Sequence, residues 1–171
     1  TSIKKHFVKS HTEYIYSIKN VNNEFYVGAS LGVDEIIDIS FQGMKLHMFF
    51  GLSFCKLSNG LYLIGSRTNS IRVSKEFNFD SKFSTVIVFG DSFTTNRINE
   101  IFEDTKKNIW IATSLGLCKA AIQLEKTGKV VLKKSFFPTN PVLSSKIISI
   151  YQDNYDNVWF AGEMGIARYN L

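Results

Sequence analysis

The stretch "KNIWIATSLGLCKA" (Lys107 to Ala120) returns in outline as "DNVWFAGEMGIARYN" (Asp156 to Asn170), 49 residues further along the chain. The segments around them, 98–117 and 147–166, align without a gap. A repeat of fixed period indicates a fold built from stacked copies of one small unit. The matching residues are Ile98 and Ile147, Ile101 and Ile150, Asp104 and Asp153, Asn108 and Asn157, Trp110 and Trp159, and Gly116 and Gly165.

Two weaker copies of the unit precede these, at residues 15–33 and 50–71. In our alignment Tyr26 and Tyr62 take the position of the two tryptophans, which separates the four aromatic residues by 36, 48 and 49 positions. A unit of roughly 40 to 50 residues is the length of one four-stranded blade of a β-propeller.

Each unit consists of short β-rich runs separated by turns, and no segment shows sustained helical periodicity. The run "IWIAT" (109–113) is apolar on both faces, as a strand between two packed sheets requires. The sequence therefore predicts an all-β protein, a β-propeller of about four four-stranded antiparallel blades. We expect a single propeller domain or a propeller fragment, 1–171, with residues 2–10 as a closing outer strand and blades near 14–50, 51–89, 98–137 and 147–171.

Composition argues against several classes of protein. The net charge of +5 comes from scattered lysines and arginines, whereas nucleic-acid-binding proteins usually cluster them. No apolar run approaches the roughly 18 residues of a membrane span. The histidines and the two cysteines, Cys55 and Cys118, lack the spacing of a metal site. We expect no metal or cofactor and two free, buried thiols, with a disulfide as the alternative.

The repeated tryptophans and aspartates each allow two interpretations. Trp110 and Trp159 lie inside apolar strands, which favours core packing over a role as sugar-stacking platforms. Asp104 and Asp153 end a strand just before a turn, where a short acidic side chain accepts hydrogen bonds from backbone N–H groups. That position favours a structural role over a catalytic pair of carboxylates. Because no triad, P-loop or dinucleotide motif is present, we expect no enzyme activity.

The pattern "I-x-x-I-x-x-D-x-x-x-N-I/V-W-x-A", followed by "G-L/I", resembles the two-component regulator propeller repeat. The resemblance runs from Ile15 to Asn170 and is strongest in the third and fourth units. In that family the repeats build the sensor regions of hybrid two-component histidine kinases, mostly from Bacteroidetes, which are thought to sense glycans or other nutrients outside the cytoplasmic membrane. The resemblance implies a periplasmic sensor fragment, because the chain carries no kinase motif.

A ligand site in a propeller is expected on the loops that share one face around the central axis, where the repeats differ. We expect these loops at 11–14, 67–70, 90–97 and 139–146, together with Ser114 and Glu163. The alternative is that their charged residues are merely solvated. The predicted ligand-binding residues are Arg67, Arg97, Lys146 and Glu163.

Three functions remain open from the sequence. The first is a sensory propeller that binds a glycan or small molecule, the second a protein-interaction or assembly module, and the third an enzyme on a propeller scaffold. Fold alone does not choose among them. For the assembly we favour a homodimer that closes a larger ring. A four-bladed ring and adjoining blades of a larger chain are the alternatives, and neither nucleic acid nor membrane insertion is expected.

Overall fold

The computed structural model describes residues 15–21, 24–29, 38–41, 44–50, 52–68, 70–76, 84–88, 97–124 and 130–171. These residues form strands and turns, and none of them belongs to a helix long and apolar enough to cross a bilayer. The predicted closing strand, residues 2–10, and the predicted loop segments 11–14 and 90–96 lie outside the described residues.

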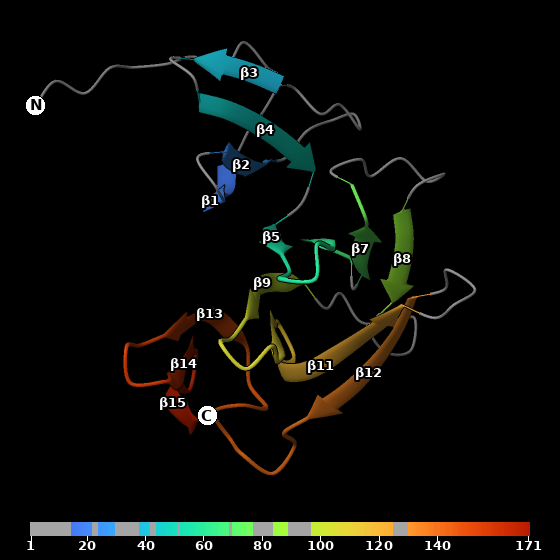
Figure 1. The fold of residues 1–171 in the computed structure, drawn as a ribbon. Helices are drawn as coiled ribbons and strands as arrows, with labels where there is room; N and C mark the ends of the chain where they lie inside the picture. The colour runs from blue at the N-terminus through green and yellow to red at the C-terminus, as the bar shows by residue number, and fades with distance from the viewer. Residues whose placement is uncertain are drawn as a thin grey trace, which may run out of the picture.

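Four sheets follow one another along the chain and around a common centre (Figure 1). The first sheet holds β1 (Ile15–Val21), β2 (Glu24–Ala29), β3 (Asp38–Phe41) and β4 (Met44–Phe50). The second holds β5 (Ser53–Lys56), β6 (Tyr62–Gly65), β7 (Ser70–Ser74) and β8 (Ser84–Val88). The third holds β9 (Ile98–Glu103), β10 (Ile109–Thr113), β11 (Gly116–Leu124) and β12 (Val130–Phe136). The fourth holds β13 (Ile147–Gln152), β14 (Asn157–Gly162) and β15 (Gly165–Asn170).

The first strand of each sheet is the innermost one. Strand β1 packs against β5, β5 against β9, and β9 against β13. The second, third and fourth sheets are antiparallel meanders in which each strand pairs with the next along the chain. This arrangement confirms the predicted all-β propeller fold.

The first sheet departs from the antiparallel order that we predicted for every blade. Its strand order is β1-β2-β4-β3, and β4 runs parallel to β2. Strand β3 is therefore the edge strand, and β4 lies in the interior of the sheet. The more apolar of the two strands has the more central place: β4 reads "MKLHMFF", whereas β3 reads only "DISF". Burial of apolar surface favours this exchange.

One turn recurs between the first two strands of the second, third and fourth sheets. A backbone hydrogen bond closes the turn. In it, the N–H of the residue before the turn donates to the carbonyl of the residue four positions later. The residue three positions after the donor has a positive φ in every copy, with values of 87°, 66° and 62° at Gly60, Lys107 and Asp156. The bonded pairs are Leu57 and Leu61, Asp104 and Asn108, and Asp153 and Asn157.

This turn corrects our alignment of the second unit. Trp110 and Trp159 each follow the closing residue of the turn by two positions, and the same count from Leu61 leads to Leu63. Leu63 therefore takes the tryptophan position, and our assignment of Tyr62 was wrong by one residue. The ring of Tyr62 packs on the other face of the sheet, against Phe54 at a centroid distance of 6.2 Å.

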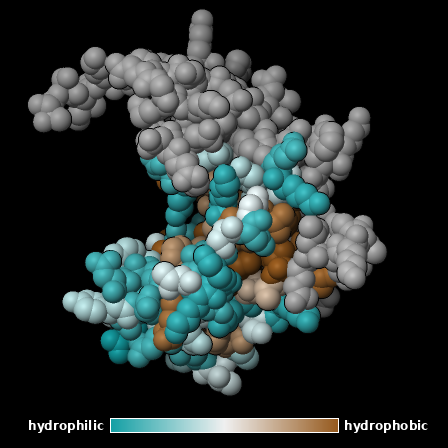
Figure 2. All heavy atoms as spheres, viewed as in Figure 1, coloured by the Kyte–Doolittle hydropathy of each residue, from teal (hydrophilic) through white to brown (hydrophobic). Residues whose placement is uncertain are grey.

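The core consists of separate apolar layers between consecutive sheets. Alternate residues of β10 supply two of these layers, because successive strand residues point to opposite faces. Ile109 and Ile111 pack towards the second sheet, and Trp110 and Ala112 pack towards the fourth. In the space-filling view, brown apolar residues gather in the middle of the molecule, between these sheets (Figure 2).

Only one of the two tryptophans is buried as predicted. Trp110 is fully enclosed, whereas Trp159 is half-buried. Val158 and Phe160 are the residues of β14 that pack against the third sheet, so Trp159 points to the opposite face. Our prediction for Trp159 was wrong because burial at this position requires a further sheet, which the described residues do not supply.

Candidate functional site

Each repeated aspartate holds its turn and its tryptophan together. Asp104 accepts hydrogen bonds from the backbone N–H of Asn108 and from the indole Nε1 of Trp110, both at 2.8 Å. Asp153 bonds Asn157 and Trp159 in the same way, at 2.9 and 2.8 Å. These bonds confirm the predicted structural role, and the indole partner is a contact that sequence reasoning missed.

The hydrogen bonds also change the acidity of Asp153. The bond from the Trp159 indole is the largest cause, and bonds from Asn157 and the Tyr155 backbone add to it. Together they lower the pKa of the Asp153 carboxyl to about 2. A carboxylate held in this way is a poor proton acceptor near neutral pH, so its chemistry is that of a turn anchor.

Two of the predicted site residues contact each other directly. Lys146 precedes β13 and Glu163 lies in the turn between β14 and β15, and their Nζ and Oε1 atoms are 3.0 Å apart. The Glu163 backbone N–H also donates to the Lys146 carbonyl at 3.0 Å. Both side chains remain substantially open to solvent, with relative exposures of 40% and 60%.

The third sheet has the same arrangement at the equivalent positions, 49 residues earlier. The Ser114 backbone N–H donates to the Arg97 carbonyl at 3.0 Å, and the Arg97 backbone N–H donates to Ser114 Oγ at 2.9 Å. The Arg97 side chain is exposed. Arg97 and Lys146 are therefore equivalent cationic residues at the start of the inner strands of two neighbouring sheets.

The loop of Arg67 continues this row of residues onto the second sheet. The backbone N–H of Ile98, next to Arg97, donates to the Ser66 carbonyl at 3.0 Å, which joins the 66–70 turn to the start of β9. Arg67 itself donates to the Tyr16 hydroxyl at 3.1 Å, and its guanidinium lies 5.6 Å from the centre of that ring. We call this row the rim; its residues are Tyr16, Arg67, Arg97, Ser114, Lys146 and Glu163.

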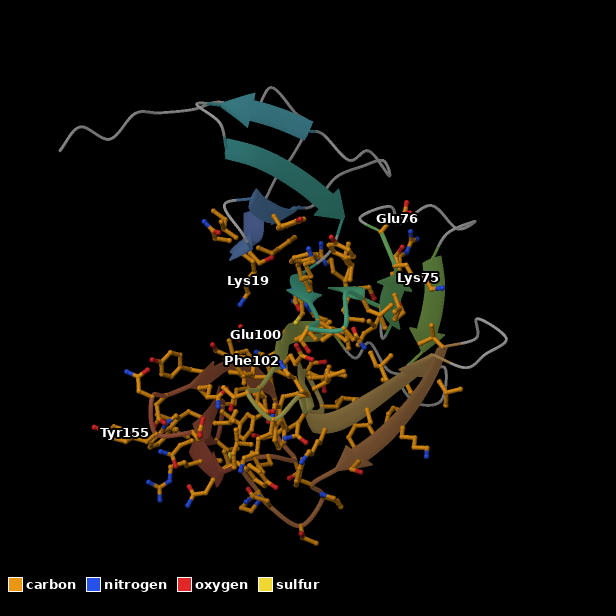
Figure 3. The ribbon with its side chains drawn as sticks, viewed as in Figure 1. Lys19, Lys75, Glu76, Glu100, Phe102 and Tyr155 are labelled. Atoms are coloured by element: carbon orange, nitrogen blue, oxygen red, sulfur yellow. The ribbon has the colours of Figure 1, made fainter. Side chains whose placement is uncertain are left out.

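A second polar cluster lies between the inner strands and was not predicted. The Glu100 carboxylate on β9 accepts from Lys19 Nζ at 2.9 Å and from the Ile150 backbone N–H at 2.7 Å. Figure 3 shows Lys19 reaching from β1 towards Glu100. One carboxylate therefore joins three sheets. The hydroxyls of Ser17 and Ser53, which take the position of Glu100 on β1 and β5, are buried and lack a hydrogen-bond partner among the described residues.

The described residues offer no obvious metal or nucleophile chemistry. Among them, no three His, Cys, Asp or Glu side chains come together as a metal site would need. Cys55 and Cys118 are free, as expected; Cys118 is buried in the layer between the second and third sheets, and Cys55 packs against that layer but is only partly buried. Burial is the largest cause that raises the pKa of these thiols, to about 12 and about 11. A thiol that stays protonated is a poor nucleophile.

The described surface also has a hollow away from the rim. It measures about 430 Å³ and is lined by Asn59, Gly60, Leu61 and Lys75. It lies at the opposite end of β6 from Arg67 and includes no residue of the rim. Of the four predicted residues, Lys146 and Glu163 contact each other directly, whereas Arg67 contacts Tyr16.

A comparison with known protein families finds a match in the third and fourth units. A model described as "Two component regulator propeller" matches residues 92–114 and 141–164. Two segments of the chain, one in the third unit and one in the fourth, thus match the two-component regulator propeller repeat. The matched segments include the inner strand, turn and tryptophan strand of the third and fourth units. No curated protein sequence matches the chain.

Solved structures share the fold of these propeller repeats. The extracellular domain of BT4673 from B. thetaiotaomicron, assigned as a one-component system, superposes with a TM-score of 0.60 at 17% identity, over 95% of this chain and 22% of that one. The extracellular domain of BT3049, assigned as a hybrid two-component system of the same organism, gives 0.56 at 18% identity, over 91% and 21%. The chain thus spans about a fifth of these solved domains, and at such identities the likeness concerns the fold alone.

Proposed function

We propose that this chain forms part of the extracytoplasmic, periplasmic sensor region of a two-component receptor and binds a glycan or another small polar molecule. The family of the repeats supports this reading, and both similar structures are extracellular domains. We propose binding rather than catalysis, because the one carboxylate pair that the repeat suggested, Asp104 and Asp153, is committed to turn hydrogen bonds.

The observation that carries the proposal is the pairing of Lys146 with Glu163 beside Arg97 and Ser114. These residues hold donors and an acceptor at one end of neighbouring sheets, on backbone fixed by the cross-loop hydrogen bonds. Sugar hydroxyl groups are both donors and acceptors, so a rim of this kind suits them. The Tyr16 ring beside Arg67 adds an aromatic surface on which a sugar ring can pack.

The test is a thermal-shift screen of neutral and acidic oligosaccharides against the wild-type chain. A ligand at about 100 times its dissociation constant stabilises the native state by roughly 2.7 kcal/mol. We expect at least one sugar to raise Tm, and we expect Lys146→Ala and Glu163→Ala to abolish the shift. The control is Lys133→Ala, which removes an exposed lysine of β12 and should leave the shift intact. A shift that survives in all three variants would place the ligand elsewhere, and a flat screen would reject sugar binding.

An interaction module without a small ligand is the second candidate. The observation in its favour is the outer face of the fourth sheet, where Tyr151 and Ile166 are 63% and 69% exposed. Exposed apolar residues gathered on one sheet face mark a surface for another protein.

A further inference from the structure

The interface between the third and fourth sheets has a simple construction. The third sheet contributes Trp110, Ala112 and Leu117, with Phe102 at the side. Lys119 covers the tryptophan, with its Nζ 5.0 Å from the centre of the Trp110 ring. The fourth sheet fills the layer with its own aliphatic and aromatic residues, which are Ile147, Ile150, Val158 and Phe160.

The opposite face of the fourth sheet repeats the third sheet's half of this interface, 49 residues later. Arg168 takes the position of Lys119, and its guanidinium lies 5.7 Å from the centre of the Trp159 ring. Leu117 is 1% exposed in the interface, whereas its equivalent Ile166 is 69% exposed. We call this the Trp159 face; its residues are Tyr151, Trp159, Ala161, Ile166 and Arg168. It is built for a sheet that the described residues do not provide.

The first sheet carries the other half of the same interface. Ile18 pairs with Val27 in the register in which Ile150 pairs with Phe160 and Ile101 with Ile111. Ile101 and Ile150 are buried against the preceding sheet, yet Ile18 is 61% exposed. We call the surface around Ile18 on β1, on the side away from the second sheet, the Ile18 face. Ile166 and Ile18 are thus exposed at the two ends of the described propeller, whereas their equivalents in the internal interfaces are buried.

A polar contact at the edge of two internal interfaces, second–third and third–fourth, extends the match. Glu103 accepts hydrogen bonds from the Ser58 N–H and hydroxyl at 2.7 and 3.0 Å. Gln152 Oε1 accepts a hydrogen bond from the Thr105 N–H at 3.1 Å, and Gln152 Nε2 donates one to the Thr105 hydroxyl at 2.8 Å.

The equivalent residues at the two open faces are Asn154 on the fourth sheet and Asn20 on the first. Both amides are exposed, and an amide can donate and accept in the same contact, although Asn20 already has an interaction within the chain.

We propose that the Trp159 face of one copy of this chain docks on the Ile18 face of a second copy, and thereby repeats the contact between the third and fourth sheets. The contact is head to tail, so it generates a closed ring or a growing chain, depending on the rotation between copies. A second copy is the expected partner because each copy carries both complementary faces. Each face has the strand register and the edge residues of the interface between the third and fourth sheets.

Two substitutions test the proposal, one on each face. Ile166→Glu places a charge on the Trp159 face, and Ile18→Glu places one on the Ile18 face. Both side chains are exposed in the single chain, so circular dichroism should confirm unchanged folding. Tyr151→Glu is the second variant for the Trp159 face if Ile166→Glu alters the spectrum. The matched control is Phe136→Glu, which places the same charge at a 50% exposed position on the outer strand of the third sheet.

Light scattering after size-exclusion chromatography gives the result. We expect the wild type and Phe136→Glu to show at least twice the monomer mass, and each face variant to be a monomer. A mixture of Ile18→Glu with Ile166→Glu should restore one intact contact and yield a one-to-one heterodimer. A monomeric wild type at roughly 1 mM, the weak end of specific affinities, would overturn the proposal. So would face variants with the wild-type mass, or a mixture that stays monomeric.

Discussion

The indole nitrogen of Trp110 donates a hydrogen bond of 2.8 Å to the carboxylate of Asp104, six residues before it in the chain. Both residues are almost completely buried. The same carboxylate accepts the Asn108 backbone N–H, so it fixes the turn and orients the largest side chain of the core at once. Asp104, which is close to Trp110 in sequence, thereby influences a long-range contact, because the fourth sheet packs on the Trp110 ring that Asp104 orients.

Removal of this carboxylate should destabilise the protein clearly. Asp104→Ala leaves the Trp110 N–H buried without an acceptor, a loss that costs about 1–3 kcal/mol. Urea denaturation followed by tryptophan fluorescence measures the change. Asp153→Ala is the matched comparison and should cost less, because water can reach the half-buried Trp159 ring. Equal losses in the two variants would contradict this account.

The two tryptophans should differ strongly when truncated. Trp110→Ala empties an enclosed site between two sheets, and such large-to-small changes cost about 3–5 kcal/mol. Trp159→Ala should cost well under half of that in the monomer, since one side of its ring lies on the open face. Thermal unfolding at matched low protein concentration compares them. If Trp159→Ala proved as damaging as Trp110→Ala, that face would be covered even in the monomer.

Acid should weaken the fold through Asp153. Its folded pKa of about 2 lies below the ordinary value of 3.8, so the ionised form is favoured in the native state. The resulting stabilisation is complete above about pH 4 and is lost as the pH falls towards 2. The free energy of unfolding of wild type should therefore decline more steeply between pH 4 and 2 than that of Asp153→Asn. Parallel curves over this range would refute the assignment.

The cysteines should resist modification while the protein is folded. Burial keeps the thiols of Cys55 and Cys118 protonated well above neutral pH, and alkylating reagents attack the thiolate. Mass spectrometry after iodoacetamide treatment at pH 8 should show little labelling in buffer and two labels per chain in denaturing urea. Rapid labelling of the native protein would show that the layer between the second and third sheets opens readily.

The period and the turn chemistry made most of the fold predictable. Asp104, Asn108 and Trp110 lie close together in sequence, so their joint role is visible in a short motif. The second unit was misaligned at Tyr62 because Leu57 stands where the third and fourth units have aspartate, and an aromatic residue neighbours the true position, Leu63. The turn geometry, which the sequence does not display, resolves the ambiguity.

Features that depend on neighbouring sheets were beyond the sequence. Trp159 occupies the same motif position as Trp110, and only the presence of a covering sheet separates a buried ring from an open one. The parallel pairing of β2 with β4 depends on whether β3 or β4 buries more apolar surface in the interior of the sheet. Glu100 lies in a strand with ordinary composition, and its partners Lys19 and Ile150 come from distant units.

The ion pair between Lys19 and Glu100 differs from the other polar contacts between sheets. Ser58 with Glu103 and Thr105 with Gln152 each join adjacent units, so they would survive if a gene duplication inserted another unit elsewhere in the series. Lys19 and Glu100 are 81 residues apart and span the intervening second sheet. An added unit between them would pull this pair apart and leave the Glu100 carboxylate without its cation. The ion pair therefore limits the number of units: it forms only when a single sheet lies between the two sheets that it joins.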